Sequence, residues 1–586
     1  MTDEEAWRSA YRHPVPWGTD YPPMSMVDLF DRSAARNAAR PAIDFMGRRY
    51  DYAQLADAVR RVATGLARIG VGKGDRVGLF LPNVPHYLAA YHGALRAGAT
   101  VVNLSPLYTV DELCHQIEDS GTRVLFTLNA AQLLPTALAV LDKSALERVI
   151  VGSVAGVLPP VTSLLYRWFK RAETAPRPDD PRVTAFSRLI DNRGDAPPVA
   201  IDPERDIALL QYTGGTTGVP KGAMLTHANV AANARQVADL DPHREATDRI
   251  LGVLPLFHVF ANTCVMNRTI ATGGEMVLLP RFDAKQALAA ITRTRPTALP
   301  GVPTMYQALL DHPALAGTDF SSLRVCISGG APLNAELKQR WEAATGSVLV
   351  EGYGLSESSG VLSVNPYEGA QKAGTIGQPL PATILRLVDK EDPARDAPPG
   401  RPGEIVARGP QVMAGYWNRP DTDGTTFATD AQGNRWLRTG DVGTIDADGF
   451  VAIVDRLKDM IAVGGFKVFP SQIEAILYRH PAVREALVIG MPDAYRGEVP
   501  RAYVTLADDA APGIDGAALM AWLNPQLGKH ERVDAVVVRD TLPKTMIGKL
   551  SRKDLLIEVR VGGGRLTAAH PDQPNTVFRF MNSWRP

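Results

Sequence analysis

Cysteine is scarce in this chain: Cys114, Cys264 and Cys326 are widely spaced among 586 residues. Three such residues argue against a disulfide scaffold and a cysteine-rich metal site, and they are typical of a reducing compartment. Charge of neither sign is in excess, because Lys and Arg total 63 and Asp and Glu also total 63. Nucleic-acid-binding proteins usually carry a basic excess, so the composition does not favour that class and no nucleic-acid partner is expected.

Long apolar runs are missing as well. No stretch of about 18 apolar residues occurs, so the sequence predicts no membrane-spanning helix. Residues 1–5 are acidic and lack the apolar segment of a secretory signal. We therefore expect a cytoplasmic protein, and its length predicts more than one domain because 586 residues exceed the usual size of a single core.

Strand-like and helix-like segments alternate along the first two-thirds of the chain. Arg76–Leu81, Thr100–Leu104 and Arg123–Leu128 are typical of strands, whereas Val84–Gly98 has helical spacing and ends at a glycine. This alternation predicts parallel sheets covered by helices, which is an α/β fold. From Asp455 the chain changes character, and a compact region of helices and strands is expected to about residue 554.

Residues 212–222 read Tyr-Thr-Gly-Gly-Thr-Thr-Gly-Val-Pro-Lys-Gly and follow the strand-like run Ile207–Leu210. Glycines let the backbone wrap closely around a ligand, and successive N–H groups in such a turn form an anion site. Lys221 is not followed by Ser or Thr, so this is not a Walker A loop, and no helix is expected to begin there. The segment predicts a polyphosphate site. Its candidate ligands are Thr213, Gly214, Gly215, Thr216, Thr217, Gly218 and Lys221.

This loop resembles the phosphate loop of the adenylate-forming superfamily, which includes acyl-CoA synthetases, firefly-type luciferases and peptide-synthetase adenylation domains. Further motifs similar to those of the family follow in the family's order, at 328–332, 351–357, 439–441, 455–460 and 543–549. The resemblance covers about residues 30–555. It implies an α/β fold with a large N-terminal domain of helix-covered sheets, a small β-barrel-like subdomain, and a small mobile α+β C-terminal domain.

The resemblance also assigns the nucleotide site. It implies that Tyr353 stacks on adenine and that Ser356 contacts the α-phosphate. Glu357, a hard oxygen ligand, would bind Mg²⁺ together with Thr213. The other adenine-side residues that the resemblance implies are Gly329, Gly330, Ala331, Gly352 and Gly354.

Three residues near the C-terminal side of the match complete the nucleotide site. A carboxylate can accept two hydrogen bonds from a ribose diol, and the resemblance assigns this role to Asp441, with Arg456 also at the ribose. It makes Lys549 the adenylation catalyst, which bridges the acyl carboxylate and the α-phosphate and compensates their negative charge.

Other residues are assigned to the thioester step. The resemblance places His258, within the apolar segment 255–260, at the acyl site as a catalytic residue where access of the thiol is gated. A core histidine with one hydrogen bond is the alternative. Gly464, Gly465 and Lys467 resemble the loop that meets coenzyme A, and Lys458 resembles the hinge about which the C-terminal domain rotates between the two steps.

The domain boundaries follow from these motifs. We expect an N-terminal extension over 1–30, the adenylation domain over 31–455, a hinge over 456–460, a C-terminal domain over 461–555 and a poorly ordered tail over 556–586.

The stretch Arg435–Met460 resembles the signature region of fatty acyl-CoA synthetases. The resemblance implies an enzyme for medium or long chains, with ATP, Mg²⁺ and coenzyme A as cofactor and co-substrates. The acid would be activated to an acyl-adenylate and then transferred to coenzyme A. An acyl-AMP ligase that loads a carrier protein, an aryl or short-chain CoA ligase, and a non-catalytic acyl- or nucleotide-binding protein are the alternatives. A homodimer is expected from the family.

Aromatic and basic residues lie side by side in Val161–Arg171, which includes Trp168, Phe169 and Lys170. This composition suits a membrane–water interface and predicts peripheral association with the inner face of a membrane. An amphipathic helix packed on its own domain explains the segment equally well, and the sequence leaves both explanations open.

Overall fold

The computed structural model describes residues 9–213, 220–243, 247–390, 392–398, 400–464, 466–507, 510–511, 513–545 and 548–562. Its chain divides into two compact units. The first unit comprises the described residues up to Ile384 together with Arg408–Thr426, and the second comprises Leu385–Ala407 and the described residues from Phe427 onward.

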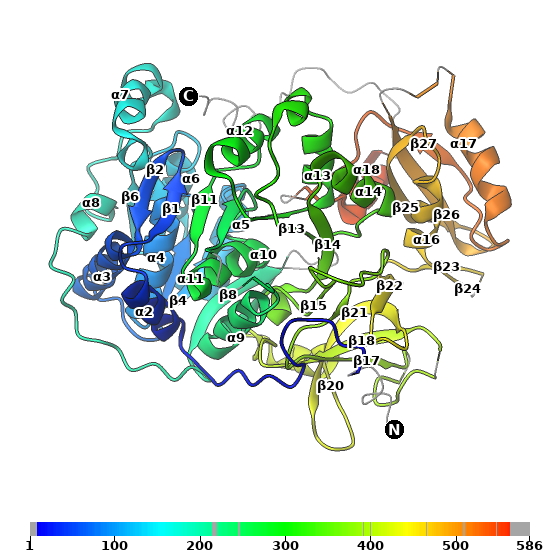
Figure 1. Ribbon diagram of the computed structural model, residues 1–586, viewed down its shortest axis with the longest axis horizontal. Coiled ribbons are helices and arrows are strands. Elements are labelled where there is room, and N and C mark those ends of the chain that lie inside the picture. The colour runs from blue at the N-terminus through cyan, green and yellow to red at the C-terminus, as the bar shows by residue number, and fades with distance from the viewer. Residues whose placement is uncertain are drawn as a thin grey trace. The chain divides into compact units, whose positions relative to one another are not determined.

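Two mixed sheets form the first unit, and each is parallel in its middle and antiparallel at one or both edges (Figure 1). The nine-stranded sheet has the order β16 (Gln378–Pro379), β15 (Ser363–Val364), β14 (Val348–Tyr353), β13 (Val325–Gly329), β12 (Ala298–Gly301), β10 (Arg249–Gly252), β11 (Glu275–Leu278), β1 (Pro41–Phe45) and β2 (Arg48–Asp51). The eight-stranded sheet has the order β19 (Gly415–Tyr416), β9 (Lys221–Thr226), β8 (Ile207–Thr213), β4 (Thr100–Asn103), β3 (Arg76–Leu79), β5 (Thr122–Leu128), β6 (Arg148–Gly152) and β7 (Val183–Ala185).

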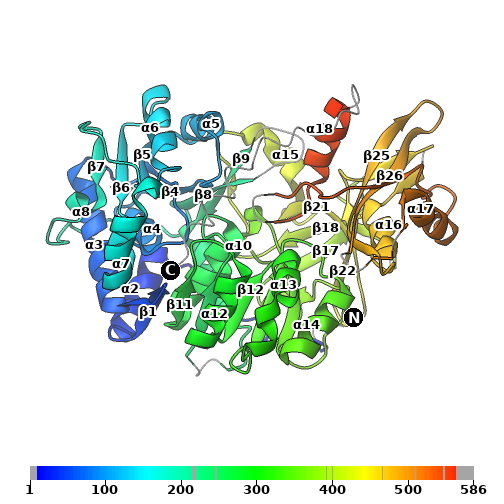
Figure 2. The same ribbon diagram turned by 90° about the horizontal axis from the view of Figure 1, so that it is seen from above.

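Helices cover both sheets of the first unit, as Figure 2 shows from a second direction. Their bounds are α2 (Met26–Arg36), α3 (Tyr52–Arg68), α4 (Pro85–Arg96), α5 (Val110–Ser120), α6 (Leu134–Lys143), α7 (Pro160–Phe169), α8 (Phe186–Leu189), α9 (His227–Ala238), α10 (Val259–Ala261), α11 (Arg268–Thr272), α12 (Ala284–Thr294), α13 (Pro303–Leu310), α14 (Ala335–Thr345) and α15 (Asp423–Thr426). Helices α12, α13 and α14 enclose an apolar core against the nine-stranded sheet, with Tyr306 and Trp341 fully buried in it.

Local sequence explains where these helices begin and end. In α5, Thr109 and Glu112 form a capping box in which each side chain accepts a backbone N–H of the other, and Gly121 ends the helix at φ +66°. The helix expected over Val84–Gly98 is observed as α4, and the three strands expected before and after it are β3, β4 and β5. Hydrophobic periodicity therefore located these elements to within a few residues.

Two smaller sheets form the second unit. One has the order β17 (Ile384–Val388), β18 (Gly403–Arg408), β21 (Arg435–Ile445) and β20 (Phe427–Thr429), with β22 (Val451–Arg456) paired to β21. The other has the order β24 (Phe466–Val468), β23 (Ile461–Val463), β26 (Gly497–Leu506) and β25 (Val483–Asp493), with β27 (Val536–Val538) paired to β26. Helices α16 (Pro470–Leu477), α17 (Gly516–Leu523) and α18 (Arg552–Gly562) accompany the second sheet.

The predicted class, a large α/β portion of helix-covered sheets with a smaller portion that follows it, is confirmed. Helix α18 runs to Gly562, so residues 556–562 of the expected tail are helical, whereas 563–586 lie outside the described residues. The expected hinge at 456–460 lies within the second unit and stays a prediction. None of the helices in the described ranges is long and apolar enough to cross a membrane.

Candidate active site

The predicted phosphate loop connects two paired strands of the first unit. Strands β8 and β9 are antiparallel, and Thr213 at the end of β8 lies opposite Lys221 at the start of β9. Lys221 thus begins a strand rather than a helix, as the sequence predicts. The residues between them, Gly214, Gly215, Thr216, Thr217 and Gly218, lie outside the described residues. The structure therefore places the two ends of the loop side by side.

Tyr416 lies between the two charged residues expected at the phosphates. It belongs to β19, which pairs with β9. The Lys221 Nζ lies 5.1 Å from the centre of the Tyr416 ring, and the Tyr416 hydroxyl donates a 2.5 Å hydrogen bond to Glu357 Oε1. Burial and the Glu357 charge both raise the pKa of Tyr416, so its hydroxyl stays protonated and remains a donor. No motif in the sequence marks Tyr416, and sequence reasoning missed it.

Asp119, near the end of α5, ties the first strand of the loop to the segment after β19. Its carboxylate accepts hydrogen bonds from the Tyr212 hydroxyl at 2.7 Å and from Arg419 at 2.8 Å. Its backbone carbonyl accepts one from the Trp417 indole at 3.0 Å. Asp119 was also missed, although an acidic residue in the last turn opposes the helix dipole and is a signal that it serves another purpose.

The two motifs expected around adenine lie next to each other. Strands β13 and β14 are parallel neighbours, with Gly329 opposite Gly352. The carboxyl ends of adjacent parallel strands are the usual location of ligands in α/β folds. Past these ends, Gly330 has φ +82° and precedes Ala331, while buried Tyr353 leads to the helical turn that begins at Ser356.

Two of the predicted glycines lie close against other parts of the chain itself. A Cβ on Gly354 would lie 2.2 Å from the backbone oxygen of Gly360, and one on Gly329 would lie 3.0 Å from the Phe260 ring. The first approach is too close for any side chain, and the second demands that the ring shift. The sequence explained glycine in such loops by close approach of a ligand, whereas the structure also assigns it to close approach of the protein's own backbone.

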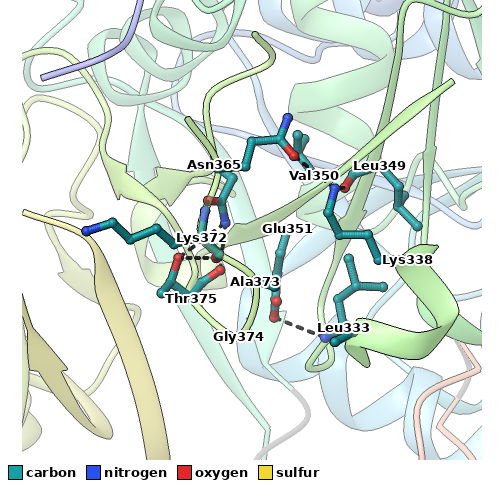
Figure 3. Close-up of a pocket in the computed structure, with 12 residues that line it drawn as sticks. Leu333, Lys338, Leu349, Val350, Glu351, Asn365, Lys372, Ala373, Gly374 and Thr375 are labelled. Atoms are coloured by element: carbon teal, nitrogen blue, oxygen red, sulfur yellow. Dashed lines mark hydrogen bonds between the residues drawn. The ribbon is translucent and has the colours of Figure 1, made fainter. Parts of the chain in front are cut away.

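A small pocket lies beside β14, and Glu351 points toward it (Figure 3). The Glu351 carboxylate accepts a hydrogen bond from the backbone N–H of Leu333 at 3.1 Å. Across the pocket, the Asn365 amide donates to the backbone oxygen of Thr375 at 2.6 Å. Burial raises the pKa of Glu351 to about 8, an effect that the single backbone hydrogen bond only partly opposes. Glu351 opens the Glu-Gly-Tyr-Gly motif, but sequence reasoning assigned no role to it.

His258 is the N-cap of the short helix α10. Its Nδ1 accepts the backbone N–H of Phe260 at 3.3 Å, which orients the ring. Two buried amide side chains hold the segment before His258. The Gln211 amide donates a hydrogen bond to the backbone oxygen of Phe257 at 3.1 Å and accepts one from the Asn103 amide at 3.1 Å. His258 is half-buried, which is compatible with both of its predicted roles, a core residue and an acyl-site residue.

Three predicted residues of the second unit come together. Asp441 on β21 lies opposite Arg456 on β22, and Arg456 Nε lies 2.9 Å from the buried Asp441 carboxylate. Lys549 follows Gly548, whose φ is +82°. Burial, reinforced by the positive charge of Arg456 and opposed by Asp441, lowers the pKa of Lys549 to about 8. The carboxylate and the guanidinium come from the paired strands β21 and β22, and the ammonium comes from a segment 93 residues after Arg456, so the three groups share one electrostatic environment.

The expected hinge is flanked by hydrogen bonds on both sides. Lys458 is exposed. Before it, the Asp455 carboxylate accepts the backbone N–H of Ser471 at 2.8 Å, and after it, the Asp459 carboxylate pairs with Arg552 at 3.1 Å. These contacts fix the ends of the linker on α16 and α18 and leave the position predicted to turn at the surface.

The loop expected to meet coenzyme A lies between β23 and β24. Gly464 has φ +57°, and its N–H donates to the backbone oxygen of Arg496 at 2.7 Å. Lys467 is exposed on β24, while Gly465 lies outside the described residues. The loop is thus held on one side by β25–β26 and presents a basic side chain.

The donors available for a metal ion are few. Among the described residues, no group of three or more His, Cys, Asp or Glu side chains is arranged to hold a metal. Glu357 offers one carboxylate whose orientation is fixed by Tyr416. This donor set fits Mg²⁺, which is commonly held by one or two carboxylates together with substrate phosphates.

Residues 30–417 match the AMP-binding enzyme family, and residues 472–549 match the AMP-binding enzyme C-terminal domain. The chain belongs to the AMP-binding enzyme family. The resemblance found in the sequence is therefore confirmed.

Several relatives of this AMP-binding enzyme match it along nearly its whole length. It is 40% identical over 562 residues to a long-chain-fatty-acid–CoA ligase of Bacillus subtilis (strain 168), which covers 95% of this chain and 99% of the relative. It is 37% identical over 528 residues to a feruloyl-CoA synthase of Amycolatopsis sp, covering 89% and 97%. Among solved structures, ATP-bound MatB from Rhodopseudomonas palustris superposes with a TM-score of 0.79 at 30% identity, covering 92% of this chain and 99% of MatB.

Proposed function

We propose that this AMP-binding enzyme is a fatty acyl-CoA ligase that activates medium- or long-chain fatty acids. In the first step a carboxylate oxygen of the acid attacks the α-phosphorus of ATP, the bond to the β-phosphate breaks, and pyrophosphate leaves. In the second step the sulfur of coenzyme A attacks the acyl carbon, AMP leaves, and the thiol proton is released. The grouping of Asp441, Arg456 and Lys549 in a chain of this family is the observation that carries the proposal.

Each residue of that group has a distinct role in the proposal. Asp441 accepts hydrogen bonds from the ribose diol, and Arg456, also at the ribose, orients the Asp441 carboxylate through their ion pair. Lys549 supplies positive charge where the carboxylate and the α-phosphate meet, and this placement of charge is the main catalytic contribution in phosphoryl chemistry. Lys458 remains the proposed hinge, and Gly464, Gly465 and Lys467 the proposed coenzyme A loop.

In this proposal, residues of the first unit bind the phosphates and the base of the nucleotide. Thr213, Lys221 and the loop between them would hold the phosphates, and Tyr353 the adenine. Glu357, with the Thr213 hydroxyl, would hold Mg²⁺ beside those phosphates. When bound, the ion neutralises charge on the pyrophosphate as it departs.

The name of the Bacillus subtilis relative supports a long-chain fatty acid as substrate. The feruloyl-CoA synthase of Amycolatopsis sp, at 37% identity, supports an aryl acid as the second candidate. The carrier-loading alternative and the binding-protein alternative have no such support. We also propose a homodimer, which light scattering of the purified protein would test.

Thioester formation decides between these candidates. The purified protein is supplied with ATP, Mg²⁺ and coenzyme A, and with saturated acids from acetate to stearate, oleate, benzoate and ferulate. A rate maximum at medium or long chains is expected. A maximum at ferulate or benzoate would replace the fatty-acid proposal with the aryl one. Pyrophosphate release without a coenzyme A thioester would point to carrier loading. If none of the acids supports pyrophosphate release, the fatty-acid proposal and the aryl proposal are both overturned.

A further inference from the structure

Helix α7 exposes its apolar side. Val161, Leu164, Leu165, Trp168 and Phe169 are 72%, 59%, 51%, 76% and 77% exposed, respectively. Their spacing of three and four residues places all five on one stripe of the helix, the pattern by which a helix normally packs on a core. Here Tyr166, on the other side, is the buried residue. The explanation of the segment as a helix packed through its apolar side is therefore wrong.

Helix α7 is exposed although the segments before and after it are anchored by hydrogen bonds. Before α7, the Arg48 guanidinium donates to the backbone oxygens of Gly156 at 2.7 Å and Leu158 at 3.2 Å. After α7, the backbone N–H of Ala131 donates to the oxygen of Glu173 at 2.9 Å. Both ends are thus fastened to the β1–β2 hairpin and to the start of α6, and α7 projects from the edge of the first unit (Figure 1).

Basic side chains accompany the apolar stripe, whereas acidic ones are few. Arg167 and Arg171 are exposed, and neither forms a side-chain ion pair among the described residues. Lys170 is paired with Glu173 at 2.8 Å, which leaves the arginines as the net charge of the helix. A stripe that contains tryptophan and phenylalanine and ends in arginine matches the chemistry of an interface between lipid tails and anionic headgroups.

We propose that α7, together with Lys170 and Arg171 directly after it, is a docking surface for the anionic phospholipid surface of a bilayer. At about 1.5 Å per residue the helix is about 15 Å long, half of the hydrocarbon thickness, so it lies in the interface and does not span it. A second copy of this chain is a poorer occupant, because a stable protein interface takes about 20–30 residues from each side and this stripe offers five side chains.

This inference goes beyond the reaction and does not depend on it. It assigns the full chain a means of meeting a bilayer surface, and binding is measured without ATP, acid or coenzyme A. Failure of the catalytic proposal and failure of this one are therefore separate results.

Vesicle co-sedimentation of the full chain tests the proposal. Wild type is expected to sediment with vesicles of phosphatidylcholine and phosphatidylglycerol and to be released by raised salt. Trp168→Ser with Phe169→Ser should lower the partition coefficient on the order of tenfold or more, because both side chains lose their apolar contact with the bilayer. Tyr495→Ser, which removes a ring that is 95% exposed on the second unit, should bind like wild type.

A second variant separates charge from apolar contact. Arg167→Gln with Arg171→Gln should weaken binding to the anionic vesicles and reduce its salt dependence, and should leave the melting temperature unchanged because both side chains are exposed. Equal sedimentation of both double variants and wild type would overturn the proposal. So would light scattering in which the Trp168 and Phe169 substitutions convert a dimer to a monomer while vesicle binding persists.

Discussion

The Tyr416 hydroxyl lies 2.5 Å from the Glu357 carboxylate and donates a hydrogen bond to it. The two residues are 59 positions apart in the sequence. The same tyrosine ring carries the Lys221 ammonium on its face at 5.1 Å. Tyr416 therefore couples the proposed metal ligand to the end of the phosphate loop, and partners of this kind orient a ligand and tune its affinity for metal.

Tyr416→Phe should weaken the apparent affinity for Mg²⁺ in the adenylation step about tenfold, because Glu357 loses the donor that fixes its orientation. Pyrophosphate release is measured against Mg²⁺ concentration at saturating ATP and acid. Tyr495→Phe, on an exposed position, is the matched control. Superimposed Mg²⁺ titrations of wild type and Tyr416→Phe would contradict this role.

Lys549→Ala should abolish adenylation while leaving thioester formation from supplied acyl-adenylate largely intact. The reason is that the ammonium compensates charge only while the carboxylate and the α-phosphate approach each other. The two half-reactions are measured separately, by pyrophosphate release and by thioester yield. Loss of both together would show that the two steps do not divide the residues as proposed.

The pKa of Lys549, about 8, predicts a pH dependence for the same step. Burial lowers this pKa, so the free enzyme loses the ammonium as the pH rises through about 8. The kcat/KM for adenylation should then fall up to about tenfold per pH unit. Lys549→Arg stays protonated in this range and should give a slower but flat profile. A wild-type profile that is flat to pH 10, or an equal fall in the arginine variant, would refute the assignment.

Gly354→Ala should destabilise the first unit by about 1–3 kcal/mol, because the added Cβ would lie 2.2 Å from the Gly360 backbone oxygen and the chain must shift. Thermal unfolding without ligands measures the effect. Gly72→Ala, where no atom lies within 4 Å of the added carbon, is the control and should change the melting temperature little. Loss of nucleotide affinity with an unchanged melting temperature would instead favour close approach of a ligand.

The sequence predicted those features of this enzyme that depend on short stretches of neighbouring residues. Strands β3, β4, β5 and β8 are apolar runs, and the Gly-Thr loop, Asp441 and Lys549 stand in motifs whose order is itself informative. The structure then brings Asp441, Arg456 and Lys549 together as the motifs imply. The prediction of their roles still awaits the experiments above.

The supporting contacts could not be predicted, because they join segments far apart in the chain. Asp119 meets Arg419 across 300 positions, and no local pattern marks either residue as the other's partner. Side-chain exposure is equally hidden: the spacing of the α7 stripe is that of a packed helix, and only the fold reveals that it faces outward. Periodicity identifies an apolar face, but tertiary structure decides what that face meets.

Glu351 provides a test of how the pocket beside β14 affects stability. Its pKa is about 8 in the folded chain, against an ordinary value of about 4.3 in an unfolded one. The stability that the protonated carboxyl contributes is thus complete below pH 4 and is lost as the pH rises through about 8, with a slope of up to about 1.4 kcal/mol per pH unit. Glu351→Gln keeps an acceptor for the Leu333 N–H but cannot ionise.

The Glu351→Gln variant should therefore gain stability over wild type between pH 5 and pH 8, by about 1–4 kcal/mol, as measured by denaturant midpoints across that range. Glu204→Gln, at an exposed carboxylate, should show no such gain. Parallel curves for Glu351→Gln and wild type would mean that Glu351 is ionised in the folded chain, and the pocket would then hold a charge rather than a neutral acid.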